Sequence, residues 1–252
     1  MLLALVAVHI ASSMANYPQQ MAYANEAWGG AKNTHNLLSD ANVDWAQELY
    51  QVKAWQDRHP GEECWFAYFA WPEVDPAVYG IRCHALPTAD TGWLGGAEIV
   101  PPVVHGAVVV SAGDLSGCEW PDGLLNPYRS LQDVPPSEVI ENSVFVYRGN
   151  GGDGVHLEQA AALSRVQRIW TLLGQHQTSQ ALALAREAAA IAPGDLEAEM
   201  TLGNVEAAAG NKAAAQSAWQ LALAAAKNLE PDAQAGYVPG LEAKLQGGGS
   251  RQ

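Results

Sequence analysis

The clearest strand of the chain is predicted at Gly106-Ala107-Val108-Val109-Val110-Ser111. An unbroken run of β-branched residues is typical of a strand that is covered on both faces. Further strands are predicted at 64–70 and 142–148, and helical stretches lie between them. Strands that alternate with helices indicate a three-layer α/β domain with a largely parallel sheet, which we expect over residues 16–148.

A helix is predicted at 45–55, where Asp44 is placed to cap its amino terminus. Pro60 and Gly61 follow the segment and are expected to end it. The apolar residues at helical spacing, which we expect to face the core, are Trp45, Leu49, Val52 and Trp55.

Residues 157–246 form a second, Ala-rich region that is predicted to be all-α. Ala181 and Ala188 recur as Ala215 and Ala222, a period of 34 that is typical of the tetratricopeptide repeat (TPR). We therefore expect a TPR-like array of helical hairpins, in which Gly203 and other small residues allow close packing and a helix near 233–245 acts as a cap. The segment 149–156 is interpreted as a Gly-rich linker before this array, and 247–252 as a disordered tail.

The composition is that of a folded, acidic protein, since 48% of the 252 residues are hydrophobic and the chain has 27 acidic but only 13 basic residues. Nucleic-acid binding depends on clustered cations, so a formal net charge of -14 argues against a nucleic-acid partner. No zinc or haem motif, phosphate loop or nucleophile motif is found, so we expect no cofactor, no metal site and no catalytic residue. The segment 149–154 fits a GxGxxG pattern, but helical repeats follow it, and we interpret it as part of the linker.

Three cysteines, Cys64, Cys83 and Cys118, are too few for a disulfide framework. We expect buried free thiols, although an oxidising compartment could bridge one pair that the sequence does not specify.

Residues 1–15 are apolar at first and end in small residues. The run is shorter than the roughly 20 residues of a spanning helix, so it is interpreted as the end of a membrane helix or as a signal-like segment. Both interpretations place the remainder outside the cytoplasm, with membrane contact only through this segment. A buried helix of a cytoplasmic protein is the remaining alternative.

Residues 17–26, Gly29-Gly30 and 39–49, followed by segments at 68–81, 110–112 and 142–147, resemble a family of bacterial membrane glycosyltransferases. These are lipid-carrier-dependent enzymes similar to the protein O-mannosyltransferases, and the resemblance is to their extracytoplasmic carboxy-terminal domain. It covers about residues 15–148, and the block around Asp40, Asn42, Asp44 and Trp45 is its most specific part. The acidic residues that activate the acceptor in that family lie in an extracytoplasmic loop near its amino terminus, among many membrane helices, so the resemblance implies no catalytic residue here.

The Asp40-x-Asn42-x-Asp44 spacing also resembles the opening of a calcium-binding loop. Trp45 stands where that loop needs Gly and Gln51 where it needs Glu, so we do not predict a calcium site. These polar residues are expected to stabilise a loop or to line a ligand pocket at the carboxyl end of a strand, the edge where open α/β sheets bind ligands. The predicted lining of such a pocket is Asn25, Glu26, Asp40, Asn42, Asp44, Trp45 and Tyr79.

These observations favour a non-catalytic extracytoplasmic accessory domain associated with a membrane glycosyltransferase. Its TPR-like tail would bind a protein partner, or a glycan or lipid-linked sugar. The alternatives are a free-standing periplasmic or secreted TPR scaffold and, with less support, an enzyme that acts on glycans.

Overall fold

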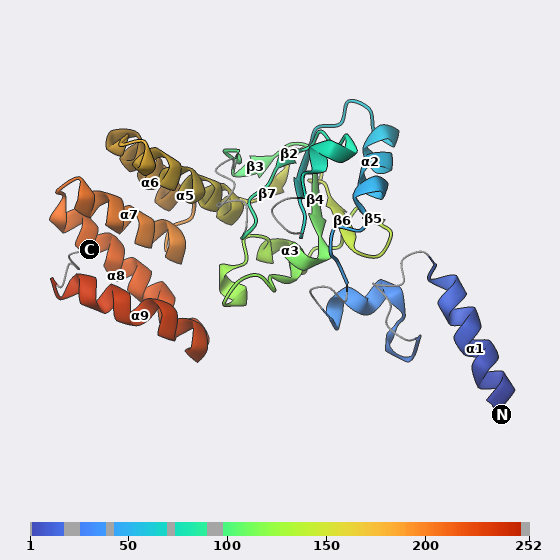
Figure 1. Ribbon diagram of the computed structural model, residues 1–252. Coiled ribbons are helices and arrows are strands. Elements are labelled where there is room, and N and C mark those ends of the chain that lie inside the picture. Colours follow the sequence, from blue (N-terminus) through green and yellow to red (C-terminus); the bar gives the residue numbers. More distant parts are fainter. Residues whose placement is uncertain (1, 18–25, 39–42, 70–73, 90–97, 248–252) are drawn as a thin grey trace.

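The computed structural model describes residues 2–17, 26–38, 43–69, 74–89 and 98–247 (Figure 1). In this part of the chain a five-stranded sheet lies at the centre, with helices α5 to α9 on one side of it and α1 extending from the other. The strands follow the spatial order β2-β1-β4-β6-β5. Their bounds are β1 (Cys64–Ala67), β2 (His84–Ala85), β4 (Ala107–Ser111), β5 (Glu138–Ile140) and β6 (Val144–Tyr147).

The sheet is mixed, so the expectation of a largely parallel sheet is wrong. β1 pairs in parallel with β2 and with β4, whereas β6 pairs antiparallel with both β4 and β5. The reason is the short connection 141–143 between β5 and β6. A parallel pair needs a crossover of about a dozen residues or more, and a connection this short allows only a hairpin.

The three predicted strands are confirmed as β1, β4 and β6, and all their residues are buried. Alternate side chains of these strands enter two separate cores. One core contains Trp65, Val108, Phe145 and the start of α5, and the other contains Phe66, Val109, Val146 and α2. Helical elements therefore cover both faces of the sheet.

The helix predicted at 45–55 begins later, as α2 (Leu49–Arg58). Leu49, Val52 and Trp55 are buried on its inner face, as predicted, and the helix ends before Pro60. Trp45 lies outside the helix and is partly exposed, so its predicted place in the core is wrong.

The second region is a row of antiparallel helices. Each helix packs against the next, and α5 also contacts α7. α6 and α8 begin at Thr178 and Lys212, 34 residues apart, in agreement with the predicted period. The helices are α5 (Glu158–Gly174), α6 (Thr178–Ile191), α7 (Leu196–Ala208), α8 (Lys212–Ala226) and α9 (Pro231–Leu245).

The segment 149–156, interpreted as a linker, is part of a packed junction. Its end forms β7 (Val155–His156), which pairs antiparallel with β3 (Val103–Val104). Gly154 has φ +75°, and a Cβ there would lie 2.5 Å from a side-chain atom of Val103, so a larger residue does not fit. Leu157 and the first turn of α5 then enter the core of the sheet, and the two regions share that core.

The remaining elements are short, apart from α1. Within the described ranges, none of the helices combines the length and the apolar character needed to cross a bilayer. These elements are α1 (Leu2–Ala15), η1 (Glu26–Trp28), η2 (Ala31–Asn36), η4 (Pro76–Tyr79), α3 (Ala112–Ser116), η5 (Gly123–Leu125) and α4 (Arg129–Gln132).

Candidate functional site

Four of the seven predicted pocket residues are described, and they do not form one group. Asp44 lies at the carboxyl end of β4, beside Gly113, and Trp45 follows it in the chain. The contacts of the other two lie elsewhere: Glu26 accepts a hydrogen bond from Ser12 of α1, and the ring of Tyr79 packs against Tyr50 with centroids 5.0 Å apart. The other predicted residues, Asn25, Asp40 and Asn42, lie outside the described residues.

Asp44 does not cap α2, which corrects the predicted N-cap. Its Oδ1 accepts a hydrogen bond from the amide of Ala46 at 3.1 Å, and its Oδ2 accepts one from the amide of Gly113 at 3.3 Å. Ala46 has φ +61°, a left-handed conformation that is unusual for a residue other than glycine. The chain therefore turns sharply after Asp44, and a helix cannot begin until Glu48, the residue at the N-cap of α2.

The same turn exposes Trp45. Its side chain is 37% exposed, and its ring meets Phe69 edge-on, with centroids 5.0 Å apart. A bond of 2.6 Å from the amide of Trp45 to the side-chain oxygen of Gln47 further stabilises this loop.

A cluster of buried carboxyl groups lies at this end of the sheet. Asp44 and Asp114 are each 1% exposed and Glu48 is 2% exposed. Ser111, the last residue of β4, donates a hydrogen bond of 3.1 Å to Asp114 and accepts one of 2.9 Å from the amide of Phe69. The fold thus brings together residues from three distant parts of the sequence.

Burial is the main cause of the altered acidity of these groups. It raises the pKa of Asp44 to about 6, although hydrogen bonds from Ser111 and from two backbone amides act in the opposite direction. It raises the pKa of Glu48 to about 7, where the nearby Ser143 hydroxyl lowers the value and the charge of Asp44 raises it. The pKa of Asp114 is also raised well above its usual range, by burial and by the charges of Glu119 and Asp44.

Carboxyl groups with pKa values of 6 to 7 can transfer protons near neutral pH, provided that they reach a substrate. Glu48 and Asp114 each keep at least one oxygen without a hydrogen-bond partner, but both side chains are covered by protein. Among the described residues, no three His, Cys, Asp or Glu side chains are grouped so that they could hold a metal ion. The cluster is therefore best explained as a set of buried, structural acids that titrate at a higher pH than exposed carboxyl groups.

Little in the sequence marks this cluster. Glu48 falls inside the segment 45–55 that is predicted to be helical, and Asp114 lies just after the predicted strand 106–111. Ser111 is the polar end of the clearest strand, and this was the signal that could have marked the position. Asp44 and Asp114 are 70 positions apart in the chain, so only the fold shows that they are neighbours.

A cavity of about 320 Å³ opens beside the cluster, on the other side of Ala112. It is bounded by η2, α3 and α4, and by the side chains of Phe145 and Tyr147 on β6. The ring of His35 lies against that of Phe145, with centroids 4.7 Å apart. None of the four described residues that were predicted to line a pocket contributes to this cavity.

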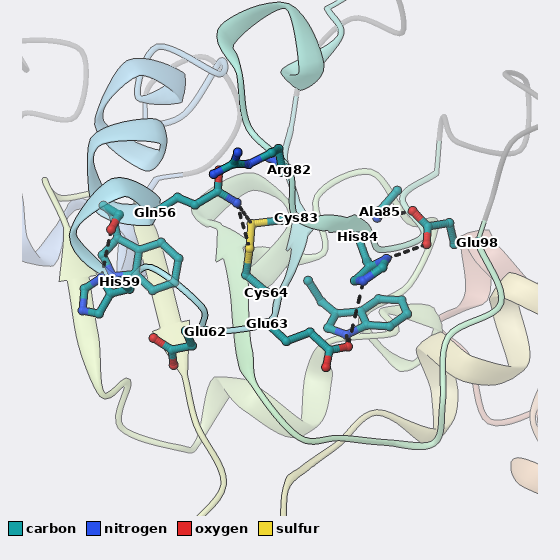
Figure 2. Close-up of a disulfide and its surroundings, with 12 residues drawn as sticks. Gln56, His59, Glu62, Glu63, Cys64, Arg82, Cys83, His84, Ala85 and Glu98 are labelled. Carbon is teal, nitrogen blue, oxygen red and sulfur yellow. Dashed lines mark hydrogen bonds and ion pairs between the residues drawn. A yellow bond between two sulfur atoms is a disulfide. The ribbon is translucent and has the colours of Figure 1, made fainter.

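A disulfide joins Cys64 of β1 to Cys83, the residue before β2, so the expectation of free thiols is wrong for this pair (Figure 2). Their Cα atoms are 4.7 Å apart, and the side-chain amide of Gln56 donates a hydrogen bond of 3.2 Å to the sulfur of Cys64. Trp65 is in register with His84, which places the two cysteines that precede them side by side. Cys118 belongs to no disulfide and is exposed.

Comparisons of the chain with models of protein families, with curated proteins and with solved structures find no match.

Proposed function

We propose that this chain is a non-catalytic, extracytoplasmic binding module, accessory to a lipid-carrier-dependent membrane glycosyltransferase, and that its TPR-like array binds a protein or glycan partner. The observation that carries the proposal is the helical array with its recurrent small residues. The disulfide supports the location, the helix α1 supports the membrane contact, and the sequence resemblance supports the association with a glycosyltransferase.

The packing of small residues in the helical array supports the TPR-like part of the proposal. Ala181 and Ala188 on α6 are buried in the same way as Ala215 and Ala222 on α8, 34 residues later. Gly203 on α7 lies directly against the ring of Trp219, since a Cβ there would be 2.3 Å from that ring. Small residues at such positions let antiparallel helices approach closely, and arrays of this kind serve mainly as binding surfaces.

The Cys64–Cys83 disulfide favours a compartment outside the cytoplasm. Structural disulfides persist in oxidising compartments and are rare where thioredoxin and glutathione keep thiols reduced. The proposed location is tested by treating intact cells with a thiol-alkylating reagent. The exposed Cys118 is the internal control, because it is alkylated whether or not the disulfide is present. Alkylation of Cys64 and Cys83 without prior reduction would contradict the proposed location.

The helix α1 has no buried residue, although it is rich in Leu, Val and Ile. A helix that is apolar on all sides is normally buried in protein or in lipid, which supports membrane contact through this segment.

The lack of catalysis and the binding role need separate tests. The purified chain, incubated with a polyprenyl-linked sugar and an acceptor peptide, is expected to transfer nothing, and transfer would refute the proposal. For binding, a photo-crosslinking residue is placed at Trp170 on α5, which is 57% exposed. A crosslink to a membrane glycosyltransferase or to its acceptor supports the proposal. A crosslink only to other periplasmic proteins favours a free-standing scaffold. The absence of any crosslink contradicts both the accessory module and the scaffold.

A further inference from the structure

The cavity between η2, α3, α4 and β6 has the properties of a small-molecule site, and it is independent of the helical array. Its volume of about 320 Å³ lies at the lower end of the range for ligand pockets, roughly 300–1,000 Å³. It adjoins Ala112, which directly follows the carboxyl end of β4. Ligands of open α/β sheets bind at this edge.

Tyr147 supplies the most informative group of the cavity. The residue as a whole is only 3% exposed, but its hydroxyl is not among the buried polar atoms that lack a partner, and no hydrogen bond within the described residues involves it, so the hydroxyl is accessible. Burial raises the pKa of this phenol to about 12, and no hydrogen bond contributes to the change. Buried tyrosine hydroxyls normally find a partner.

Other buried or half-buried tyrosines of the chain follow that rule. The hydroxyl of Tyr128 donates to the carbonyl of Pro87 at 2.6 Å, and that of Tyr237 bonds to the carboxylate of Glu197 at 3.1 Å. The phenol of Tyr147 makes no such bond within the described residues and is accessible at the cavity, where a ligand can supply a hydrogen-bond partner.

Two side-chain amides bring further polar atoms to the cavity. Gln132 donates a hydrogen bond of 2.8 Å to the carbonyl of Leu115, and Asn36 donates one of 2.9 Å to the side-chain oxygen of Asn33. Both contacts use the amide nitrogen, which leaves the amide oxygens as acceptors for the hydroxyl groups of a ligand.

The charges around the cavity select a neutral ligand. The described residues of its lining include no Asp, Glu, Lys or Arg side chain. Among these residues an anion would find no Lys or Arg, and a cation would find no carboxylate in direct contact. Phe145, Val134 and Pro136 provide an apolar wall beside the polar atoms.

We propose that this cavity binds a small, neutral, polyhydroxylated molecule of the size of a single sugar ring, with the Tyr147 hydroxyl as a direct contact. Such a ligand offers several hydroxyl groups to the phenol and the amides, and an apolar ring face to the wall. The proposal does not rest on the function proposed for the array and can fail or succeed separately.

The test is ligand-observed NMR and calorimetric titration of the full chain with glucose, mannose and galactose, at concentrations up to about 10 mM, since single rings bind weakly. Glucuronate and glucosamine serve as charged rings of the same size. We expect at least one neutral ring to bind and the charged rings to bind more weakly. No binding of any neutral ring, or tighter binding of a charged one, would overturn the proposal.

Tyr147→Phe removes only the hydroxyl, and because that hydroxyl makes no bond within the protein the variant is expected to fold normally. It should weaken binding about three- to tenfold, the effect of one hydrogen bond. Tyr50→Phe is the matched control, since Tyr50 is exposed and lies against Tyr79, outside the cavity. Asn36→Ala, an exposed change at the rim of the cavity, provides a second variant. Unchanged affinity in both Tyr147→Phe and Asn36→Ala would show that the ligand binds elsewhere.

Discussion

Replacing Glu48 by Gln tests the account of the buried carboxyl cluster directly. Neither oxygen of Glu48 has a hydrogen-bond partner among the described residues, and the side chain is 2% exposed. Gln has nearly the same shape as Glu but cannot ionise, so Glu48→Gln removes the charge with little change in packing.

The magnitude follows from the pKa of this group. A rise from 4.5 to about 7 makes ionised Glu48 about 3 kcal/mol less favourable in the folded protein than in the unfolded chain. Between pH 4.5 and pH 7 the folded state holds a proton that the unfolded state has lost. The free energy of unfolding therefore falls as the pH rises, by up to about 1.4 kcal/mol per pH unit for this group. Above pH 7 the whole penalty is present, and Gln at this position avoids it.

The assay is urea unfolding of the wild type and of Glu48→Gln at several pH values from about 5.5 to 8.5, above the isoelectric point near 4.7 so that both proteins stay soluble. Part of the penalty, about 1.4 kcal/mol, is already present at pH 5.5, so we expect the stability advantage of the variant over the wild type to grow by about 2 kcal/mol between pH 5.5 and pH 8.5. Asp153→Asn, an exposed acid in a turn, makes the same change of charge and should show no such trend. A difference in stability between Glu48→Gln and the wild type that stays constant across this range would refute the assigned ionisation of Glu48.

Three further predictions concern packing and covalent structure. Gly203→Ala gains about 1 kcal/mol of helix propensity, but the added Cβ would lie 2.3 Å from the ring of Trp219. Because overpacking of this kind costs about 1–3 kcal/mol, thermal unfolding should show a net loss of stability. The Cys64–Cys83 disulfide closes a loop with a sequence separation of 19. Its reduction should lower the free energy of unfolding by about 3 kcal/mol and the melting temperature by roughly 6–12 °C. The reducing agent should not affect a control variant with Ser at both positions. Arg165 is buried and donates hydrogen bonds to two backbone carbonyls, one of them in the α/β region. Arg165→Met should therefore lower the free energy of unfolding by about 2–4 kcal/mol. In calorimetry it should also separate the unfolding transition of the array from that of the sheet.

The strands were predictable because their signals are local. The run at Val108 to Val110 and the segments around Phe66 and Phe145 are apolar enough to indicate buried strands without knowledge of the fold. The direction of the strands was not predictable in this way. β5 (Glu138–Ile140) is only three residues long, too short to show a strand pattern, and the antiparallel pairing of β6 with both β4 and β5 makes the sheet mixed.

The candidate site was only partly predictable for a different reason. Asp44 stood out in a block of polar residues, but its interactions are with Gly113 and Ser111, more than 60 positions away. Periodicity placed Trp45 on a helix because it occurs at the right spacing before Leu49. A turn with a left-handed Ala46 overrides that spacing, because a side-chain hydrogen bond from Asp44 competes with the first turn of the helix.

The junction between the two regions explains how so short an array can be stable. About three TPR-like units are normally needed to bury a continuous core, and the period of 34 accounts for only two here. The α/β region provides the missing contacts at one end, since Leu157, Ala160 and Ala161 belong to the core of the sheet. At the other end α9 covers α8 through Ala233 and Leu241, the role predicted for a capping helix. Because the first helix belongs to both regions, its packing in the core of the sheet ties the array to the α/β region.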